Sequence, residues 1–85
     1  MKSLHKALNI LEYVINHDDH EVAPTEVSRA LDLHLATTAR IMGEFAKLGY
    51  LEQRNTRGGY FPGPAVFTFA DRMNSTYARL ARAAA

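Results

Sequence analysis

The sequence predicts a domain that is mainly α-helical with one small β-hairpin. Two short segments with helical spacing of apolar residues flank a tight turn at residues 32–34. A glycine-rich turn then separates strand-like residues 50–54 from residues 59–61, and a long amphipathic segment follows. Two helices joined by a turn of roughly three or four residues form a helix-turn-helix, and a hairpin after it forms a wing. The predicted architecture is a winged helix-turn-helix followed by a C-terminal linker or dimerisation helix.

The first helix is expected from Ser3 to about Asn16. Ser3 is a favourable N-cap residue, and apolar residues follow it at helical spacing. The polar segment at residues 17–21 holds two histidines beside carboxylates. Such a pair can bind a metal, but we interpret the segment as a solvated connector. Residues 22–23 are a candidate short strand.

The second helix is expected to start at the Pro-Thr-Glu sequence of residues 24–26. Thr25 is placed to cap it, and Glu26 suits the positive end of the helix dipole. Asp32 occupies a turn position that favours a left-handed backbone, which aspartate tolerates better than most residues other than glycine. The residues expected on the inner face of this helix are Val27, Ala30 and Leu31.

The third helix, at about residues 36–48, is the predicted recognition helix, and Gly49 is its expected C-terminal stop. Its expected inward residues are Ile41, Met42, Phe45 and Leu48, and its expected outward residues are Thr37, Arg40 and Lys47. Gly43 is unusual here, because glycine in a helix interior costs about 1 kcal/mol relative to alanine. Either it permits a close approach of the backbone to DNA or it is variation without consequence.

The predicted wing spans residues 54–59. Gly58 and Gly59 suit a hairpin turn because both can adopt positive φ. Arg54 and Arg57 are placed to reach a phosphate or the minor groove, and we expect a role for them in DNA binding.

The last predicted element is an amphipathic helix that starts at Pro64, a favoured first helical residue. Its apolar stripe is too long for so small a domain to cover, so we expect a partner helix and a homodimer. The expected dimer contacts are Leu4, Leu8, Val66, Phe69, Met73, Tyr77 and Leu80. We assign residues 1–63 to the winged helix-turn-helix and residues 64–85 to the linker or dimerisation helix.

Composition limits the possible classes of protein. The chain has 85 residues, enough for one small domain, and its apolar fraction of 47% is ordinary for a globular protein. It contains no cysteine, which excludes a disulfide framework and a thiolate zinc site. No apolar run approaches the roughly 18 residues of a membrane span, and no signal peptide is evident. We expect a cytoplasmic protein without a cofactor or metal and without a membrane partner.

Charge is distributed unevenly along the chain. Residues 1–33 carry three basic and six acidic side chains, whereas residues 34–85 carry seven basic and three acidic ones. The positive half contains the predicted recognition helix and wing, where DNA phosphates would be met.

Several segments together resemble the N-terminal DNA-binding domain of IclR-type transcriptional regulators. They are residues 3–8, 25–28, 37–42, 49–51 and 60–64, and the resemblance runs from about residue 3 to residue 70. It implies a bacterial regulator that binds double-stranded DNA at a pseudo-palindromic operator. It also implies a larger effector-binding domain, which we expect to be absent from this chain. The residues expected to contact DNA are Thr25, Leu35, Ala36, Thr37, Thr38, Arg40, Gly43, Lys47, Arg54, Arg57 and Gly58.

The sequence departs from the family pattern in the turn and at the start of the third helix. Asp32 replaces the usual glycine, His34 the common proline and Ala36 the serine that normally caps the helix. Pro62 stands where an apolar strand residue is usual. Arg40 can read guanine or clamp a phosphate, and Thr38 can contact a phosphate or bond within its own helix.

Two other classes of function compete with DNA binding. A winged helix can bind protein or RNA, although that role does not require the outward threonine and the arginines on one side. An enzyme is not supported, because the sequence has no cysteine nucleophile, no phosphate-binding loop and no evident pair of catalytic carboxylates.

Overall fold

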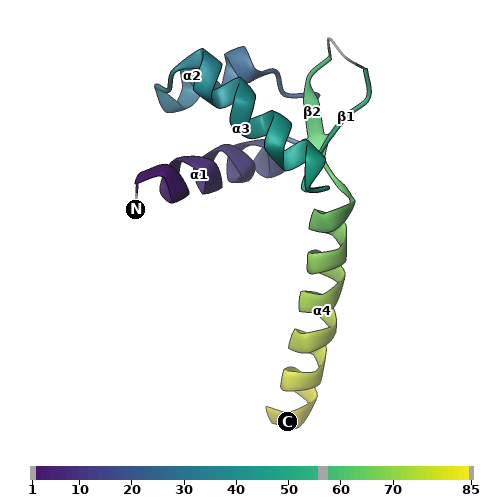
Figure 1. The fold of residues 1–85 in the computed structure, drawn as a ribbon. Helices are drawn as coiled ribbons and strands as arrows, with labels where there is room; N and C mark the ends of the chain where they lie inside the picture. Colours follow the sequence, from purple (N-terminus) through teal and green to yellow (C-terminus); the bar gives the residue numbers. More distant parts are fainter. Residues whose placement is uncertain (1, 56–57, 85) are drawn as a thin grey trace.

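A computed structural model describes residues 2–55 and 58–84 of the chain. In chain order its elements are α1 (Lys2–Asn16), α2 (Pro24–Leu31), α3 (Leu35–Lys47), β1 (Leu51–Gln53), β2 (Tyr60–Pro62) and α4 (Pro64–Ala84). The helices α1, α2 and α3 form one body, the β1–β2 hairpin projects from it, and α4 extends away from both (Figure 1). The predicted winged helix-turn-helix with a C-terminal helix is confirmed.

One hydrophobic core joins the three-helix body to the hairpin. Its buried residues are Ile10, Val14, Val22, Val27, Met42, Leu51 and Tyr60. Each large aliphatic side chain that leaves water here contributes roughly 1.5–3 kcal/mol to folding. Because every element before α4 supplies at least one of these side chains, the core fixes the position of the wing relative to α3.

The helix-turn-helix depends on left-handed backbone at two positions, both expected from the sequence. Asp32 has φ 53° and ψ 53° at the C-terminal end of α2, and Gly49 has φ 88° just after α3. The backbone N–H of Leu33 donates to the Ser28 carbonyl at 2.8 Å across the turn. This bond satisfies one of the last carbonyls of α2, as a Schellman-type ending does.

The wing is an antiparallel pair in which Leu51 faces Pro62 and Gln53 faces Tyr60. On the other edge of β2, Val22 and Tyr60 exchange two backbone hydrogen bonds of 2.8 and 2.9 Å. The short strand expected at residues 22–23 is therefore reduced to a single bridge between Val22 and the wing.

The reason for glycine at position 59 differs from the one expected. Among the residues whose φ the structure describes, only Asp32 and Gly49 have positive values, so Gly59 does not need left-handed backbone. A Cβ added at Gly59 would lie 2.8 Å from the backbone carbonyl carbon of Val22. Glycine is required here because it lets the segment before α2 approach the wing closely enough to pair with it.

Two predicted helix caps are wrong. Ser3 lies inside α1, which begins at Lys2, and Thr25 lies inside α2. The N-cap residue of α2 is Ala23, whose side chain makes no capping hydrogen bond. Pro24 takes the first helical position, where its missing N–H leaves no donor unsatisfied, and this moves the start of α2 before Thr25.

Two residues predicted to face inward are exposed instead. Ala30 on α2 is exposed, and Leu48 is 67% exposed. Leu48 follows the last residue of α3, and the left-handed Gly49 turns the chain immediately after it. The backbone N–H of Leu48 still donates to the Glu44 carbonyl at 3.1 Å, so Leu48 keeps the helical spacing and yet lies exposed at the end of α3.

The C-terminal helix touches the domain only near its start. The backbone N–H of Ala65 donates to the Gly49 carbonyl at 2.9 Å, and the ring of Phe69 stacks on Tyr50 with centroids 5.8 Å apart. Beyond Phe69, the apolar side chains of Met73, Tyr77 and Leu80 are exposed. The uncovered apolar stripe predicted for this helix is confirmed.

Candidate nucleic-acid interface

The orientation of α3 is set by two fully buried side chains, Thr38 and Met42. Residues two or five positions from either of them then lie on the opposite face, because each residue turns about 100° around the axis. That face carries Ala36, Arg40, Gly43 and Lys47. Three of these residues are exposed and Gly43 is half-buried, so α3 presents two cations that alternate with small residues.

Thr38 does not belong to this exposed face. Its side chain is fully buried, and its hydroxyl donates a hydrogen bond to the His34 carbonyl at 2.8 Å. The bond within the helix, one of the two alternatives for this residue, is the one formed. The expected phosphate contact of Thr38 is therefore wrong for this conformation, because the hydroxyl is already used one turn back inside the core.

The other residues predicted to contact DNA have varied exposure. Those with exposed side chains are Thr25, Leu35, Ala36, Arg40, Lys47 and Arg54, and those that are half-buried are Thr37, Gly43 and Gly58. Arg57 lies outside the described residues. The start of α3 is formed by Leu35, with His34 as an N-cap residue that makes no side-chain capping bond.

The described part of the wing is held by side-chain contacts between its two arms. The guanidinium carbon of Arg54 lies 4.4 Å from the centroid of the Phe61 ring. The side-chain amide of Gln53 donates to the Gly58 carbonyl at 2.8 Å. A cation over an aromatic face contributes about 0.5–1 kcal/mol at an exposed site. Both contacts reduce the conformational freedom of the wing, so Arg54 lies on a hairpin that its own side chains hold in place.

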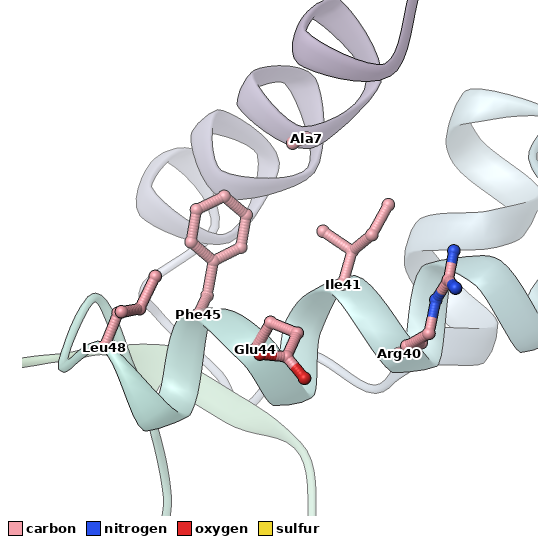
Figure 2. Close-up of a pocket in the computed structure, with 6 residues that line it drawn as sticks. All are labelled: Ala7, Arg40, Ile41, Glu44, Phe45 and Leu48. Carbon is pink, nitrogen blue, oxygen red and sulfur yellow. The ribbon is translucent and has the colours of Figure 1, made fainter.

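A shallow apolar groove of about 440 Å³ lies between α1 and α3 (Figure 2). Ile41 and Phe45 point from α3 toward Ala7 on α1, and Leu48 lies at the end of the groove beyond Phe45. Arg40 and Glu44 complete its lining. The groove thus borders the exposed face of α3 on the side of α1.

Comparison with known families decides what kind of helix-turn-helix this is. The family model of the IclR helix-turn-helix domain matches residues 3–55, which span α1 to the end of β1 and more than half of the chain. The chain belongs to the IclR helix-turn-helix family. It is therefore a DNA-binding helix-turn-helix domain of the kind found in transcription regulators. No match was found among curated proteins.

Two elements of this IclR-type domain lie outside the matched residues. β2 and α4 both lie beyond residue 55. Among the described helices, α4 included, none is long and apolar enough to cross a membrane.

On α1 and α4, the residues predicted to form a dimer are mostly exposed. They are Leu4, Leu8, Phe69, Met73, Tyr77 and Leu80, whereas Val66 is half-buried.

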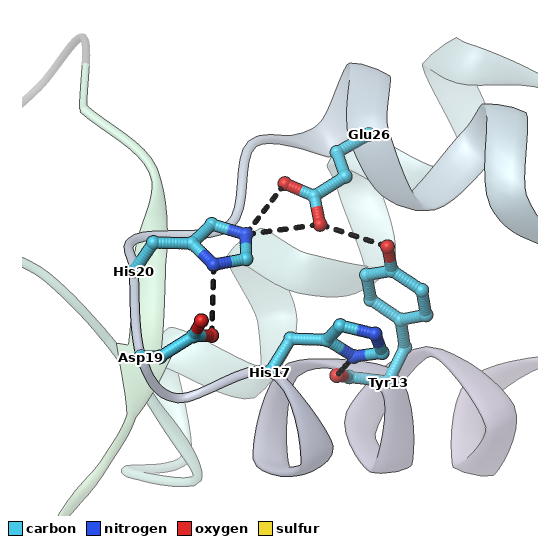
Figure 3. Close-up of polar contacts among 5 residues, drawn as sticks. All are labelled: Tyr13, His17, Asp19, His20 and Glu26. Carbon is cyan, nitrogen blue, oxygen red and sulfur yellow. Dashed lines mark hydrogen bonds and ion pairs between the residues drawn. The ribbon is translucent and has the colours of Figure 1, made fainter.

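A polar network at the start of α2 was not predicted from the sequence (Figure 3). The Tyr13 hydroxyl donates to one Glu26 oxygen at 2.8 Å, and the Nε2 of His20 lies 3.0 Å from the other. The Nδ1 of His20 lies 2.9 Å from the Asp19 carboxylate. Residues 18–21 of the connector between α1 and α2 are exposed, as expected, and His20 ties the connector to the first turn of α2.

The contacts of the network shift the pKa values of Glu26 and His20. The Tyr13 hydroxyl lowers the pKa of the Glu26 carboxyl most, burial opposes this shift, and His20 lowers the pKa further. Hydrogen bonds to Glu26 and then to Asp19 raise the pKa of His20. The Nδ1 of His17 lies 2.7 Å from the Tyr13 carbonyl, and its ring stacks on that of Tyr13. Within the described residues, no group of three or more candidate ligands is arranged to hold a metal.

Proposed function

We propose that this domain binds one double-stranded DNA sequence with α3 in the major groove and the wing on the backbone or in the minor groove. The observation that carries the proposal is the exposed face of α3, where the small residues Ala36 and Gly43 alternate with Arg40 and Lys47. Small side chains allow a helix to lie close to the base edges, and arginine is the commonest side chain to read guanine. Thr37 and Arg40, in the first turns of α3, are the proposed base contacts.

Charge and geometry support a second contact through the wing. Arg54 is exposed and held over Phe61, and both sit on a hairpin that the core fixes beside α3. Thr25, exposed in the first turn of α2, and Lys47 are the proposed phosphate contacts. Phosphate contacts hold a protein in register on the duplex, whereas base contacts carry the sequence preference.

We further propose that the protein acts as a homodimer, with residues 1–63 binding DNA and residues 64–85 forming a linker and dimerisation helix. The support is the exposed apolar stripe of α4 together with the exposed Leu4 and Leu8 on α1. Two-fold symmetry then requires a pseudo-palindromic operator, with half-sites about 10–10.5 base pairs apart or a multiple of that spacing.

Selection of bound duplexes from a random pool tests the proposal directly. The expected result is a two-fold related consensus, and the selected duplex should bind more tightly than a scrambled duplex across a series of salt concentrations. An RNA of matching sequence should not compete. Recovery of no consensus would reject sequence-specific binding.

Sedimentation of the 85-residue chain tests the dimer separately. Its expected outcome is a dimer on the selected duplex. A single protomer at high micromolar concentration, both free and with the duplex, would reject dimerisation through α1 and α4.

A further inference from the structure

One acidic side chain lies among the cations of α3. Glu44 is one turn after Arg40, and its side chain is 61% exposed. In Figure 2 its carboxylate points away from α1, whereas Ile41 and Phe45 point toward α1. Its Oε1 lies 3.3 Å from Nζ of Lys47. The carboxylate is therefore presented to solvent beside the proposed DNA-binding face.

The contacts of Glu44 within the fold assign it no structural role. An exposed carboxylate in the middle of a helix takes no part in capping, and an exposed ion pair such as that with Lys47 adds little to stability. On a surface that approaches DNA, the same carboxylate is repelled by the phosphates. A negative charge in this position weakens binding to every DNA sequence, except where a hydrogen bond to the carboxylate offsets the repulsion.

The major groove offers such a bond. A carboxylate only accepts hydrogen bonds, and the exocyclic N4 amino group of cytosine is the donor that glutamate and aspartate characteristically accept from. Lys47 supports this use, because it holds one carboxylate oxygen of Glu44 and offsets part of the repulsion by the phosphates. Arg40 and Glu44, one turn apart on α3, are then suited to neighbouring base pairs.

We propose that Glu44 is a specificity-determining residue that accepts a hydrogen bond from the N4 amino group of cytosine in each half-site. This inference rests on the proposed placement of α3 in the major groove. Within that placement, Glu44 favours the base pair that offers the cytosine N4 donor. A duplex without this donor at that position meets only the repulsion between the carboxylate and the phosphates. Specificity of this kind comes from an unfavourable contact with the wrong partner as much as from a favourable contact with the right one.

The test uses Glu44→Gln in the whole chain, with selection from the same random duplex pool as the unchanged protein. Glutamine has nearly the same shape but no charge, and it pairs with adenine through N6 and N7. At one position of each half-site we expect the preference for cytosine to disappear and adenine to be favoured. Affinity for the original duplex should fall by about 5- to 150-fold, the range of one lost base contact. Affinity for scrambled duplexes should rise.

Glu12→Gln is the matched control, because Glu12 is exposed on α1 and the substitution removes the same charge. It should leave the selected sequence unchanged. Circular dichroism and the thermal midpoint show that each variant is folded. Selection of the same sequence by the unchanged protein and by Glu44→Gln would overturn the role of Glu44 while leaving sequence-specific binding intact. Selection of no sequence by the unchanged protein would instead reject the proposed function.

Discussion

The Tyr13 hydroxyl donates a 2.8 Å hydrogen bond to the Glu26 carboxylate and so joins α1 to the first turn of α2. The two residues are 13 positions apart, and His20 approaches the same carboxylate from the connector between them. Three segments that position the helix-turn-helix therefore converge on one side chain.

Removing this hydrogen bond should destabilise the domain slightly. In Tyr13→Phe the ring remains, and with it the stacking on His17 at 4.0 Å, but the donor to Glu26 is lost. We expect a thermal midpoint lower by a few degrees. The pKa of Glu26 should also rise toward its ordinary value, because the Tyr13 hydrogen bond is the largest cause of its lowering. Carbon NMR of the Glu26 carboxyl measures this pKa, and an unchanged value would show that the bond does not form in solution.

Stability should depend on pH through His20. Its pKa is raised in the folded state, so its contribution is complete below the ordinary value of 6.5 and is lost as pH rises through the folded value. The lowered pKa of Glu26 works in the opposite sense, and its contribution is lost as pH falls below the ordinary value of 4.5. The network should therefore stabilise the domain most between these two values.

Urea unfolding at a series of pH values checks this dependence. The difference in unfolding free energy between the unchanged protein and His20→Gln should be largest at mildly acidic pH and should shrink above neutrality. His5→Gln, on the exposed surface of α1, is the matched control and should show no such trend. A difference that stays constant with pH would mean that the charge of His20 plays no part.

Gly43 provides a test in which stability and binding change in opposite directions. A Cβ added there meets nothing within 4 Å, so packing does not require glycine. Gly43→Ala should stabilise α3 by up to about 1 kcal/mol. If the backbone of α3 lies close to the base edges, the same methyl group should weaken DNA binding. Chemical unfolding and a DNA titration measure the two effects, and unchanged affinity would show that Gly43 does not face DNA closely.

Arg40→Ala should distinguish base reading from phosphate binding. If Arg40 reads guanine, affinity for the selected duplex should fall by about 1–3 kcal/mol and the preference at one base pair should relax. Thr37→Ala should act similarly but less strongly. Titration against duplexes that vary each base pair is the measurement. Equal weakening for every duplex would instead identify Arg40 as a phosphate contact.

The wing should contribute mainly to the salt dependence of binding. Each neutralised phosphate adds close to one unit to the slope of log affinity against log salt. Changing Arg54 and Arg57 together to alanine should flatten that slope by about two units per wing while the selected sequence stays the same. Arg79→Ala, on the exposed part of α4, is the control. An unchanged slope in the double variant would exclude the wing from DNA contact.

The sequence alone determined those features that depend on local backbone sterics. Asp32 in left-handed conformation, the left-handed Gly49 just after α3 and the start of α4 at Pro64 are each set by what one residue permits its own φ and ψ to be. Helical spacing of apolar residues likewise identified Met42 in the core of α3 and the uncovered stripe of α4, but it also directed the exposed Leu48 inward. The family could be recognised for the same reason, since its pattern lies in this order of helices and turns.

Only the tertiary structure decided which side chains meet across the fold. The contact of Tyr13 with Glu26, the approach of Gly59 to Val22 and the position of Arg54 over Phe61 join residues whose distance along the chain gives no sign of pairing. Thr38 illustrates the limit, because its hydroxyl could contact a phosphate or bond within its own helix, and packing against the core decides for the second. Local sterics act within a few residues, so their effect on the backbone can be predicted from the sequence alone. Burial depends on every element packed around a side chain and therefore requires the tertiary structure.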